Sequence, residues 1–385
     1  MNKIESLYKY IETPNLEWEI IDKELLYSFI EKMKNTSQDK TFHQEGDVYI
    51  HTKMVCEELI KLPVYKTLPK KQKLELFLAA LFHDVGKTLT TKIEENHITS
   101  PHHGPTGSCL VREFFIKNLG IAGKEEYLTF RETICSLIRY HTSPIFLGVD
   151  ADERKIIKLS LLKDLTNDFT LEMLSLLSIA DMKGRIGPNT DEKLFNIELF
   201  KEYAINLSCY KDSYKFSDNY TKYKYLNGAN ILPNQSLYND SNNEIILLVG
   251  LPGTGKDTFI KNNYPNSIVI SLDDLRDKLK IKPTDNQGIV YTTAKELAKE
   301  YLRTNTPFIW NATNTTNLIR SKQIKLFHDY NATVKIIYLE TTLENVLKRN
   351  KSRKKEVIEN VIFDMLKTLT LPEPFEAESI QWICI

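Results

Sequence analysis

Residues 245–258 read IILLVGLPGTGKDT, and this stretch decides the fold of the C-terminal part of the chain. Its first five residues are continuously apolar, which is typical of a strand buried on both faces of a parallel sheet. Gly250, Gly255 and Lys256 then follow the G-x4-G-K spacing of a loop that surrounds phosphate groups. In such a loop the backbone N–H groups and the next helix's N-terminus face phosphate oxygens, and the lysine reaches the β- and γ-phosphates. The stretch therefore predicts a nucleotide-phosphate site between a strand and a helix.

The loop departs from the usual pattern at the position that normally binds Mg²⁺. The residues expected to contact the nucleotide are Gly250, Gly253, Thr254, Gly255, Lys256, Asp257 and Thr258. The pattern has serine or threonine directly after the lysine, whereas Asp257 stands there and Thr258 follows. A carboxylate can hold Mg²⁺ directly or through water, and Thr258 is the alternative ligand. ATP and Mg²⁺ are thus the expected cofactors of this part, with the Mg²⁺ ligand left open.

The sequence beyond the loop alternates short apolar runs with helical segments. Residues 267–271, 308–310 and 334–339 are the further expected strands. Strands that alternate with helices predict an α/β domain with a doubly wound parallel sheet. Residues 348–355 form a basic run, and a basic run taken alone usually marks a solvated helix face.

Three motifs follow these strands, and together they resemble the phage-type 5′-OH polynucleotide kinase family over about residues 244–360. They are Asp273-Asp-Leu-Arg276, Thr313-Asn314 and Arg349-Asn-Lys-Ser-Arg353. The resemblance implies that Asp273 is the general base on the 5′-hydroxyl, that Arg276 grips a phosphate of the acceptor, and that Asn314 positions the acceptor. It also implies that Arg353, with Arg349, belongs to a lid that stabilises the transferring phosphoryl group. These roles suit phosphoryl transfer, which depends on positioning and on positive charge around the phosphate.

The N-terminal part is helical in pattern and rich in histidine. Seven of the eight histidines lie between His43 and His141. Residues 74–82 are apolar nearly all round, as in a buried helix, so we expect an all-α module. His83 and Asp84 follow that helix directly, and imidazole with carboxylate suits divalent ions such as Mn, Co, Ni or Mg.

The histidine pattern resembles the HD-domain phosphohydrolase superfamily over about residues 40–190. The resemblance rests on His51, the His83-Asp84 pair, Lys87 and Asp181. It implies that His51, His83, Asp84 and Asp181 bind a first metal ion. Lys87 and Arg185 would neutralise the phosphate that a water activated by the metal attacks.

Three further histidines are candidates for the same site. His103 and His141 fall where two-metal members of the superfamily place additional histidines. A second metal would stabilise both the attacking and the leaving oxygen of a phosphoester. Hydrogen bonding of the two histidines to substrate phosphate or to water is the alternative. His43 is a candidate for the pocket wall, less favoured as a ligand than His51.

Length, charge and cysteine usage bound the remaining possibilities. The 385 residues predict an HD-type domain at 1–206, a linker rich in Tyr and Asn at 207–243 and a P-loop kinase domain at 244–385. With 51 basic and 51 acidic residues the net charge is zero, so bulk electrostatics does not indicate a nucleic-acid binder. Five scattered cysteines, no secretory signal and no apolar span predict a soluble cytoplasmic protein without a membrane partner.

The two parts, in this order, resemble bacterial fusions of an HD phosphohydrolase with a polynucleotide kinase. That family heals RNA breaks by removing 2′,3′-cyclic or 2′/3′ phosphates and by phosphorylating 5′-OH ends. The resemblance implies RNA or DNA ends as substrates and a companion RNA ligase as a partner. The alternatives are a nucleotide or nucleoside kinase fused to a nucleotidase, and a nucleotide-sensing regulator that Asp257 alone supports. The sequence leaves RNA versus DNA, the number and identity of the metals and the oligomeric state open.

Overall fold

The computed structural model describes all residues of the chain except 1, 14, 95–96, 242, 282–284 and 354. The chain divides into two compact units, which are described in turn. The first comprises residues 1–121 and 126–214, and the second comprises residues 122–125 and 215–385. In the parts that the structure describes, no helix is both long enough and apolar enough to span a membrane. The five cysteines form no disulfide bond with one another.

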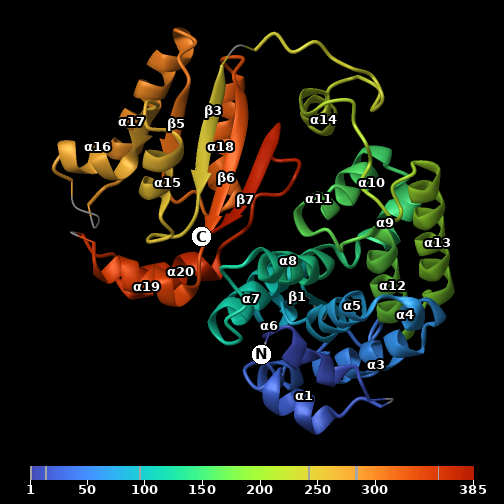
Figure 1. Ribbon diagram of the computed structural model, residues 1–385. Helices are drawn as coiled ribbons and strands as arrows, with labels where there is room; N and C mark the ends of the chain where they lie inside the picture. The colour runs from blue at the N-terminus through green and yellow to red at the C-terminus, as the bar shows by residue number, and fades with distance from the viewer. Residues whose placement is uncertain (1, 14, 95–96, 242, 282–284, 354) are drawn as a thin grey trace. The chain divides into compact units, whose positions relative to one another are not determined.

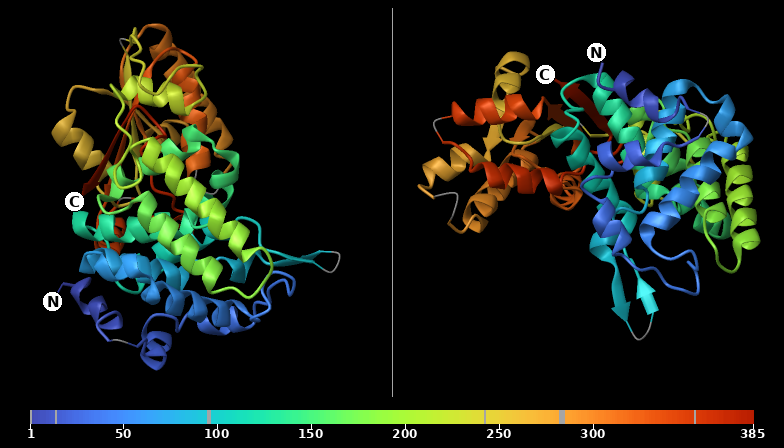
Figure 2. Two further views of the ribbon diagram at one scale, coloured as in Figure 1. Left: turned by 90° about the vertical axis from the view of Figure 1, so that its right-hand side faces the viewer. Right: turned by 90° about the horizontal axis from the view of Figure 1, so that it is seen from below.

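The first unit is built of helices, as the sequence predicts (Figure 1). Its helices are η1 (Glu5–Tyr10), α1 (Trp18–Glu24), α2 (Ile30–Lys34), α3 (Val48–Lys61), α4 (Pro63–Thr67), α5 (Lys70–Phe82), α6 (Lys87–Thr90), α7 (His103–Lys117), α8 (Glu125–Tyr140), α9 (Ser143–Asp150), α10 (Glu153–Ser160), α11 (Lys163–Thr166), α12 (Leu171–Lys183) and α13 (Thr190–Asn206). One small antiparallel hairpin, β1 (Lys92–Glu94) and β2 (His97–Thr99), is added to them. The hairpin projects from the helices of this unit (Figure 2).

The central helix of the first unit is α5, and it determines where the site can form. Every residue from Leu74 to Phe82 is buried, in agreement with the apolar run in the sequence. Helices α3, α5 and α12 pack against one another. A Cβ atom at Gly184 would lie 2.6 Å from the backbone nitrogen of Val55, so glycine permits the close approach of the end of α12 to α3. Residues that are distant in sequence are thereby brought to one place.

The second unit contains the expected parallel sheet. Its strands are β3 (Glu244–Val249), β4 (Ile268–Ser271), β5 (Phe308–Asn311), β6 (Thr333–Glu340) and β7 (Ser379–Cys384). All neighbouring pairs are parallel, in the order β4-β5-β3-β6-β7. The helices are α14 (Asn219–Leu226), α15 (Lys256–Asn263), α16 (Leu272–Lys278), α17 (Gly288–Arg303), α18 (Asn317–His328), α19 (Leu343–Lys351) and α20 (Glu359–Lys367). The edge strand β7 is not among the strands expected from the sequence.

The strand order places a topological switch point at β3. From β3 the chain first builds β4 and β5 on one side and then β6 and β7 on the other. Ligands of doubly wound sheets bind outside the carboxyl ends of strands at such a point. The loop 250–255 follows the carboxyl end of β3, so the fold puts it where a nucleotide is expected.

The segment 207–243, expected as a linker, is divided between the two units and contains a helix. Residues 207–214 belong to the first unit and residues 215–243 to the second, where α14 forms. Tyr225 of α14 is buried, and the ring centroid of Tyr223 lies 4.4 Å from that of His328. These two tyrosines therefore pack against their own unit.

Candidate metal centre and phosphate-binding loop

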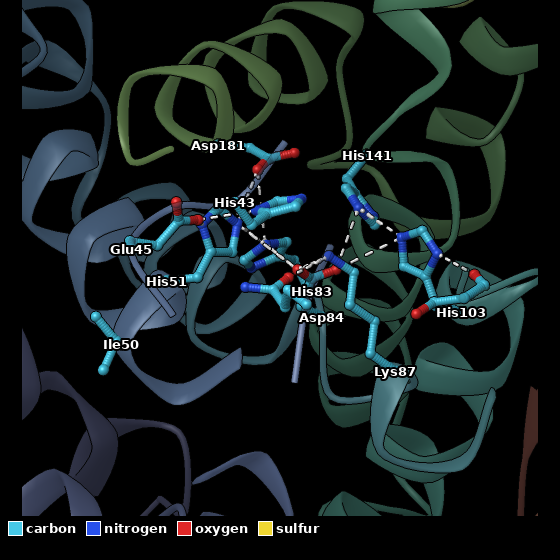
Figure 3. Close-up of polar contacts among 12 residues, drawn as sticks. His43, Glu45, Ile50, His51, His83, Asp84, Lys87, His103, His141 and Asp181 are labelled. Carbon is cyan, nitrogen blue, oxygen red and sulfur yellow. Dashed lines mark hydrogen bonds and ion pairs between the residues drawn. The ribbon is translucent and has the colours of Figure 1, made fainter. Parts of the chain in front are cut away.

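The candidate metal centre lies where α3, α5 and α12 meet, and Figure 3 shows its side chains. His51 comes from α3, His83 and Asp84 directly follow α5, and Asp181 lies on α12. His51 Nε2 lies 3.0 Å from Asp181 Oδ1 and 3.4 Å from His83 Nε2. His83 Nε2 lies 3.3 Å from Asp84 Oδ2. The structure thus brings together the four residues that the sequence predicts as ligands of the first metal.

A second group of potential ligands adjoins the first, and Asp84 belongs to it. His103 Nε2 lies 3.2 Å from His141 Nε2 and 3.5 Å from Asp84 Oδ1. Asp84 Oδ2 faces His83, whereas Asp84 Oδ1 faces His103, so one carboxylate lies between two groups of imidazoles (Figure 3). In each group, {His51, His83, Asp181} and {Asp84, His103, His141}, the candidate ligand atoms lie within 4.8 Å of one another.

Backbone carbonyl oxygens around the candidate metal centre orient three of its imidazole rings. The Nδ1 atoms of His83, His103 and His141 each contact a backbone carbonyl oxygen, at 2.8, 2.9 and 2.8 Å. A ring that donates its Nδ1–H outward keeps a lone pair on Nε2 that points inward, which is the arrangement of metal-binding histidines. His51 Nδ1 instead lies 2.9 Å from Oε1 of Glu45.

Glu45 is a functional candidate that the sequence did not reveal. It also accepts a hydrogen bond from His43 Nδ1 at 2.8 Å and one from the backbone nitrogen of Ile186 at 2.9 Å. His43 is therefore held next to His51 through a shared carboxylate, and it contributes to the wall of the adjoining cavity. A lone glutamate in a polar turn has no periodic signal, so only the fold reveals its contact with His51.

The protonation states suit a divalent cation. Burial raises the pKa of the Asp84 carboxyl, but the charges of Lys87 and His83 outweigh burial and hold that pKa well below its usual range. Burial, together with the charges of His103 and His83, lowers the pKa of His141 to about 3, so its ring is neutral. Burial also lowers the pKa of His51, but Asp181 and Glu45 raise it to about 9, and a bound cation would displace that proton.

Asp84 provides a further test of the fit. Both of its oxygens are buried, and neither accepts a hydrogen bond of ordinary geometry from the described residues, although Lys87 Nζ lies 2.6 Å from Oδ2. Buried carboxylate oxygens without hydrogen bonds are costly unless a cation binds them. Nitrogen and oxygen donors together match a borderline or hard divalent ion. The residues present therefore fit a divalent metal site.

A cavity of about 320 Å³ lies beside this centre, and cations line it. Lys87, Arg185, Lys193 and the two histidines His43 and His103 are in its wall. Arg185 is buried and donates to the Pro188 carbonyl oxygen at 3.0 Å. Among the residues that the structure describes, no carboxylate oxygen lies within 4 Å of the Arg185 or Lys193 side-chain nitrogens. Charge left unpaired in this way suits an anion, and Lys193 joins the two cations expected from the sequence.

The phosphate-binding loop has the geometry that its glycines predict. Gly250, Gly253 and Gly255 all have positive φ, at 155°, 83° and 96°. A Cβ atom at Gly253 would lie 2.7 Å from the Val346 carbonyl oxygen, so no larger residue fits there. Lys256 Nζ donates to the carbonyl oxygens of Gly250 and Leu251, at 2.8 and 2.9 Å. The Thr254 hydroxyl is buried and also donates to Leu251 O.

Asp257 and Thr258 both lie in the first turn of α15, and both are exposed. Asn311, at the end of β5, donates from Nδ2 to Asp257 Oδ1 at 2.7 Å. Asn311 is a second residue whose contact the sequence did not reveal, because β5 and α15 are brought together only by the parallel sheet. This hydrogen bond orients the carboxylate through Oδ1 and does not involve Oδ2.

Asp273 and the arginines of the expected lid are brought together. Arg276 donates to Asp273 Oδ1, and Arg353 Nη2 donates to Asp273 Oδ2 at 3.0 Å. Burial raises the pKa of Asp273, but the hydrogen bond and charge of Arg276 and the charge of Arg353 outweigh it, so the pKa is lowered. Arg349 Nη1 reaches Thr254 O at 3.4 Å, which links α19 to the phosphate-binding loop. Lys354, in the same basic run, lies outside the described residues.

The Asn314 side chain contacts the end of β3. The side chain is only 2% exposed, and its Nδ2 donates to Leu248 O at 2.7 Å. Its Oδ1 accepts a hydrogen bond from Gln323 Nε2 at 3.2 Å. These contacts attach Asn314 to the end of β3, and the role in acceptor positioning that the resemblance implies stays a prediction.

Comparison with known proteins finds one matching family in each part of the chain. The model of the HD domain family matches residues 48–165, and the model of an AAA domain family matches residues 245–372. A multifunctional CCA protein of Psychromonas ingrahamii is 31% identical over 42% of this chain and 36% of its own length. An L-seryl-tRNA(Sec) kinase of Methanococcus maripaludis is 27% identical over 33% of this chain and 53% of its own length. The chain thus spans between about a third and a half of these relatives.

The two matches coincide with the two sites, except that Asp181 lies beyond the HD match. The HD match contains the candidate ligands His51, His83, Asp84, His103 and His141. The AAA match contains the loop 250–255 and the arginines Arg349 and Arg353. The chain therefore joins an HD domain to a P-loop, kinase-like domain of the AAA type.

Proposed function

We propose that the protein is a bifunctional nucleic-acid end-healing enzyme. The P-loop domain transfers the γ-phosphate of ATP to 5′-OH polynucleotide ends, and the HD domain removes 2′,3′-cyclic or 2′/3′ phosphates from RNA ends. The observation that carries this proposal is the ionised Asp273, held by Arg276 and Arg353 in the same domain as the phosphate-binding loop. That arrangement suits a hydroxyl acceptor flanked by phosphate, and it occurs in one chain with a metal-type hydrolase centre.

In the kinase step the chain supplies positioning and charge. The N–H groups of the loop and the Lys256 ammonium hold the triphosphate, and Arg349 and Arg353 offset the charge on the transferring group. The Asp273 carboxylate accepts the proton of the attacking hydroxyl as its oxygen bonds to the γ-phosphorus, while the bond from that phosphorus to the bridging oxygen breaks and ADP leaves. Asp257, oriented by Asn311, is the residue that would hold Mg²⁺, and the ion would supply positive charge at the phosphates.

In the hydrolase step the cations of the cavity bind the phosphate. Arg185 and Lys193 are free to pair with phosphate oxygens, and Lys87 lies beside Asp84 at the border of the centre. His51, His83, Asp84 and Asp181 would hold a divalent ion of the Mn, Co, Ni or Mg type, and Asp84 with His103 and His141 would hold a second. The metal supplies Lewis acidity and an activated water when bound.

A polynucleotide acceptor is favoured over a free nucleoside by the arginine pattern and by a relative. Arg276 lies directly beside Asp273, where it can bind a phosphate next to the reacting hydroxyl, a group that free nucleosides lack. The name of the Methanococcus kinase also describes an acceptor carried by RNA. A nucleoside kinase fused to a nucleotidase is the second candidate, and ATP-consuming regulation without an acceptor is the third.

One experiment tests both halves. The protein is incubated with ATP, Mg²⁺ or Mn²⁺, and an RNA that bears 5′-OH and 2′,3′-cyclic phosphate ends, and both ends are then mapped. We expect a 5′-phosphate and a 3′ end without phosphate, the products that an RNA ligase companion would use. Phosphorylation of free nucleosides in preference to the RNA would replace the proposal with the monomer kinase. ATP hydrolysis that no acceptor stimulates would indicate the regulator.

A further inference from the structure

An aromatic ring stands among the cations that line the HD cavity. Phe42 is part of the cavity wall and is 44% exposed. Lys193 Nζ, another wall atom, lies 5.8 Å from the centroid of the Phe42 ring. Exposed rings that border a functional cavity commonly offer a flat apolar surface to a ligand, while nearby cations hold its charged part.

Backbone hydrogen bonds hold the turn that carries the Phe42 ring. The backbone nitrogen of Phe42 donates to Asp39 O at 3.1 Å, and that of Gln44 donates to Ile186 O at 2.8 Å. A Cβ atom at Gly187 would lie 2.5 Å from Phe42 O, so residues 186–187 pack directly on the Phe42 backbone. Arg185 precedes that segment. The backbone that carries Phe42 is therefore held against the segment that directly follows Arg185.

The β1–β2 hairpin is tied to the same turn. Ile98 of β2 lines the cavity, and its backbone nitrogen donates to Asp39 Oδ2 at 3.2 Å. The cavity thus combines two apolar side chains, Phe42 and Ile98, with the cations at its wall. A volume of about 320 Å³ lies at the lower end of the ~300–1,000 Å³ of small-molecule sites, so the cavity suits one nucleotide at a strand end.

We propose that Phe42 is a stacking platform for the base of the terminal nucleotide whose phosphate the HD centre removes. This inference rests on the proposed function and deepens it. The phosphate lies among Arg185, Lys193 and Lys87, and the base lies on the face of the Phe42 ring. Stacking tolerates every base because each has a π-face, so the site accepts strand ends of any sequence but disfavours phosphates that lack a base.

The test compares two RNAs that carry the same 2′,3′-cyclic phosphate, one with a base on the terminal ribose and one abasic there. We expect wild-type protein to have a KM about 5- to 150-fold lower for the RNA with the base, the range that corresponds to one base–aromatic stack. Phe42→Leu keeps an apolar side chain without a π-face, so the ratio of the two KM values should fall to about one. Phe42→Tyr is the matched control and should restore the difference.

A second measurement does not depend on turnover. A terminal 2-aminopurine nucleotide is titrated onto protein kept in a chelator, and its fluorescence should be quenched by wild type and Phe42→Tyr but not by Phe42→Leu. The proposed stacking role of Phe42 would be refuted if wild type had the same KM for both RNAs. It would also be refuted if Phe42→Leu raised the KM for both RNAs by the same factor. Either result would leave the proposed function standing. No hydrolysis of either RNA by metal-loaded wild type would overturn the hydrolase half, and the platform with it.

Discussion

Asp273 is kept ionised by two arginines, and its role can be tested alone. Arg276 and Arg353 each donate a hydrogen bond to a different oxygen of this carboxylate. General-base catalysis contributes typically ~10²–10⁴-fold, so Asp273→Ala should lower the kinase kcat by about that factor and spare the hydrolase. Transfer of label from γ-labelled ATP to a 5′-OH oligonucleotide measures the rate. Asp274→Ala removes an exposed neighbouring carboxylate and is the control. An unchanged rate in Asp273→Ala would remove Asp273 from the acceptor site.

Asp257 stands where a hydroxyl usually binds Mg²⁺, and Asn311 orients it. We expect Asp257→Ala to lower kinase activity and raise the Mg²⁺ concentration required, because loss of the carboxylate would weaken binding of the ion that offsets phosphate charge. Asp257→Ser should restore part of the activity. Titration of Mg²⁺ measures all variants, with Thr258→Ala as the comparison. A severe effect of Thr258→Ala with a mild effect of Asp257→Ala would assign the metal to Thr258.

Lys256 makes ATP binding depend on pH. Burial, which outweighs the charge of Asp257, lowers the pKa of its ammonium to about 8. The protonated form binds phosphate, so the affinity for ATP should fall as the pH rises through about 8, and binding should then take up protons. Calorimetric titration across that range measures both effects. Lys256→Arg stays charged throughout and should show a flatter profile, whereas equal profiles would show that Lys256 does not titrate there.

At the scale of the helix, the start of α3 determines where His51 lies. Asp47 is the N-cap residue, and its Oδ1 accepts a hydrogen bond from the backbone nitrogen of Ile50 at 2.8 Å. Asp47→Ala should lower the free energy of opening α3 by about 0.5–2 kcal/mol, as loss of an N-cap does. Hydrogen exchange of the α3 amides measures that free energy. Asp47→Ser keeps an acceptor and should retain most of the stability, so equal losses in both variants would refute the cap.

The sequence predicts helices and strands better than it predicts the contacts within a site. The buried helix at 74–82 and the strand before Gly250 follow from local apolar patterns, because burial of a whole segment leaves a signal in neighbouring residues. The contacts of Glu45 and Asn311 leave none, since each depends on segments that only the fold brings together. Asn314 shows the converse: its motif was visible, but its burial depends on tertiary packing.

The same distinction explains the cavity. Lys193 lies on α13 in a sequence that looks like a solvated helix face, and it becomes a wall residue only because α13 packs within the first unit. Arg185 was expected at the phosphate, and the structure adds that its guanidinium is buried. Residue types therefore predicted the chemistry of the centre, whereas the shape of the surrounding cavity required the fold.

On the scale of the whole molecule, each unit has its own core and its own site. The candidate metal ligands all belong to the first unit, and the phosphate-binding loop, Asp273 and the arginines of the expected lid all belong to the second. Each site is therefore made of residues from its own unit. This separation predicts that each activity can be removed while the other is retained.

Asp84→Ala tests that separation, because Asp84 lies between both groups of histidines. Its loss should weaken metal binding by more than the about 10–100-fold that outer contacts contribute, and hydrolysis of 2′,3′-cyclic phosphate ends should then fall below detection. Kinase activity on a 5′-OH oligonucleotide should remain at the wild-type rate, since the P-loop unit retains all of its own residues. Metal content after dialysis and both activities are measured on one preparation, with Asp273→Ala as the reciprocal variant. Loss of both activities in a folded Asp84→Ala protein would mean that the hydrolase centre and the kinase site depend on each other, contrary to the separate construction of the two units.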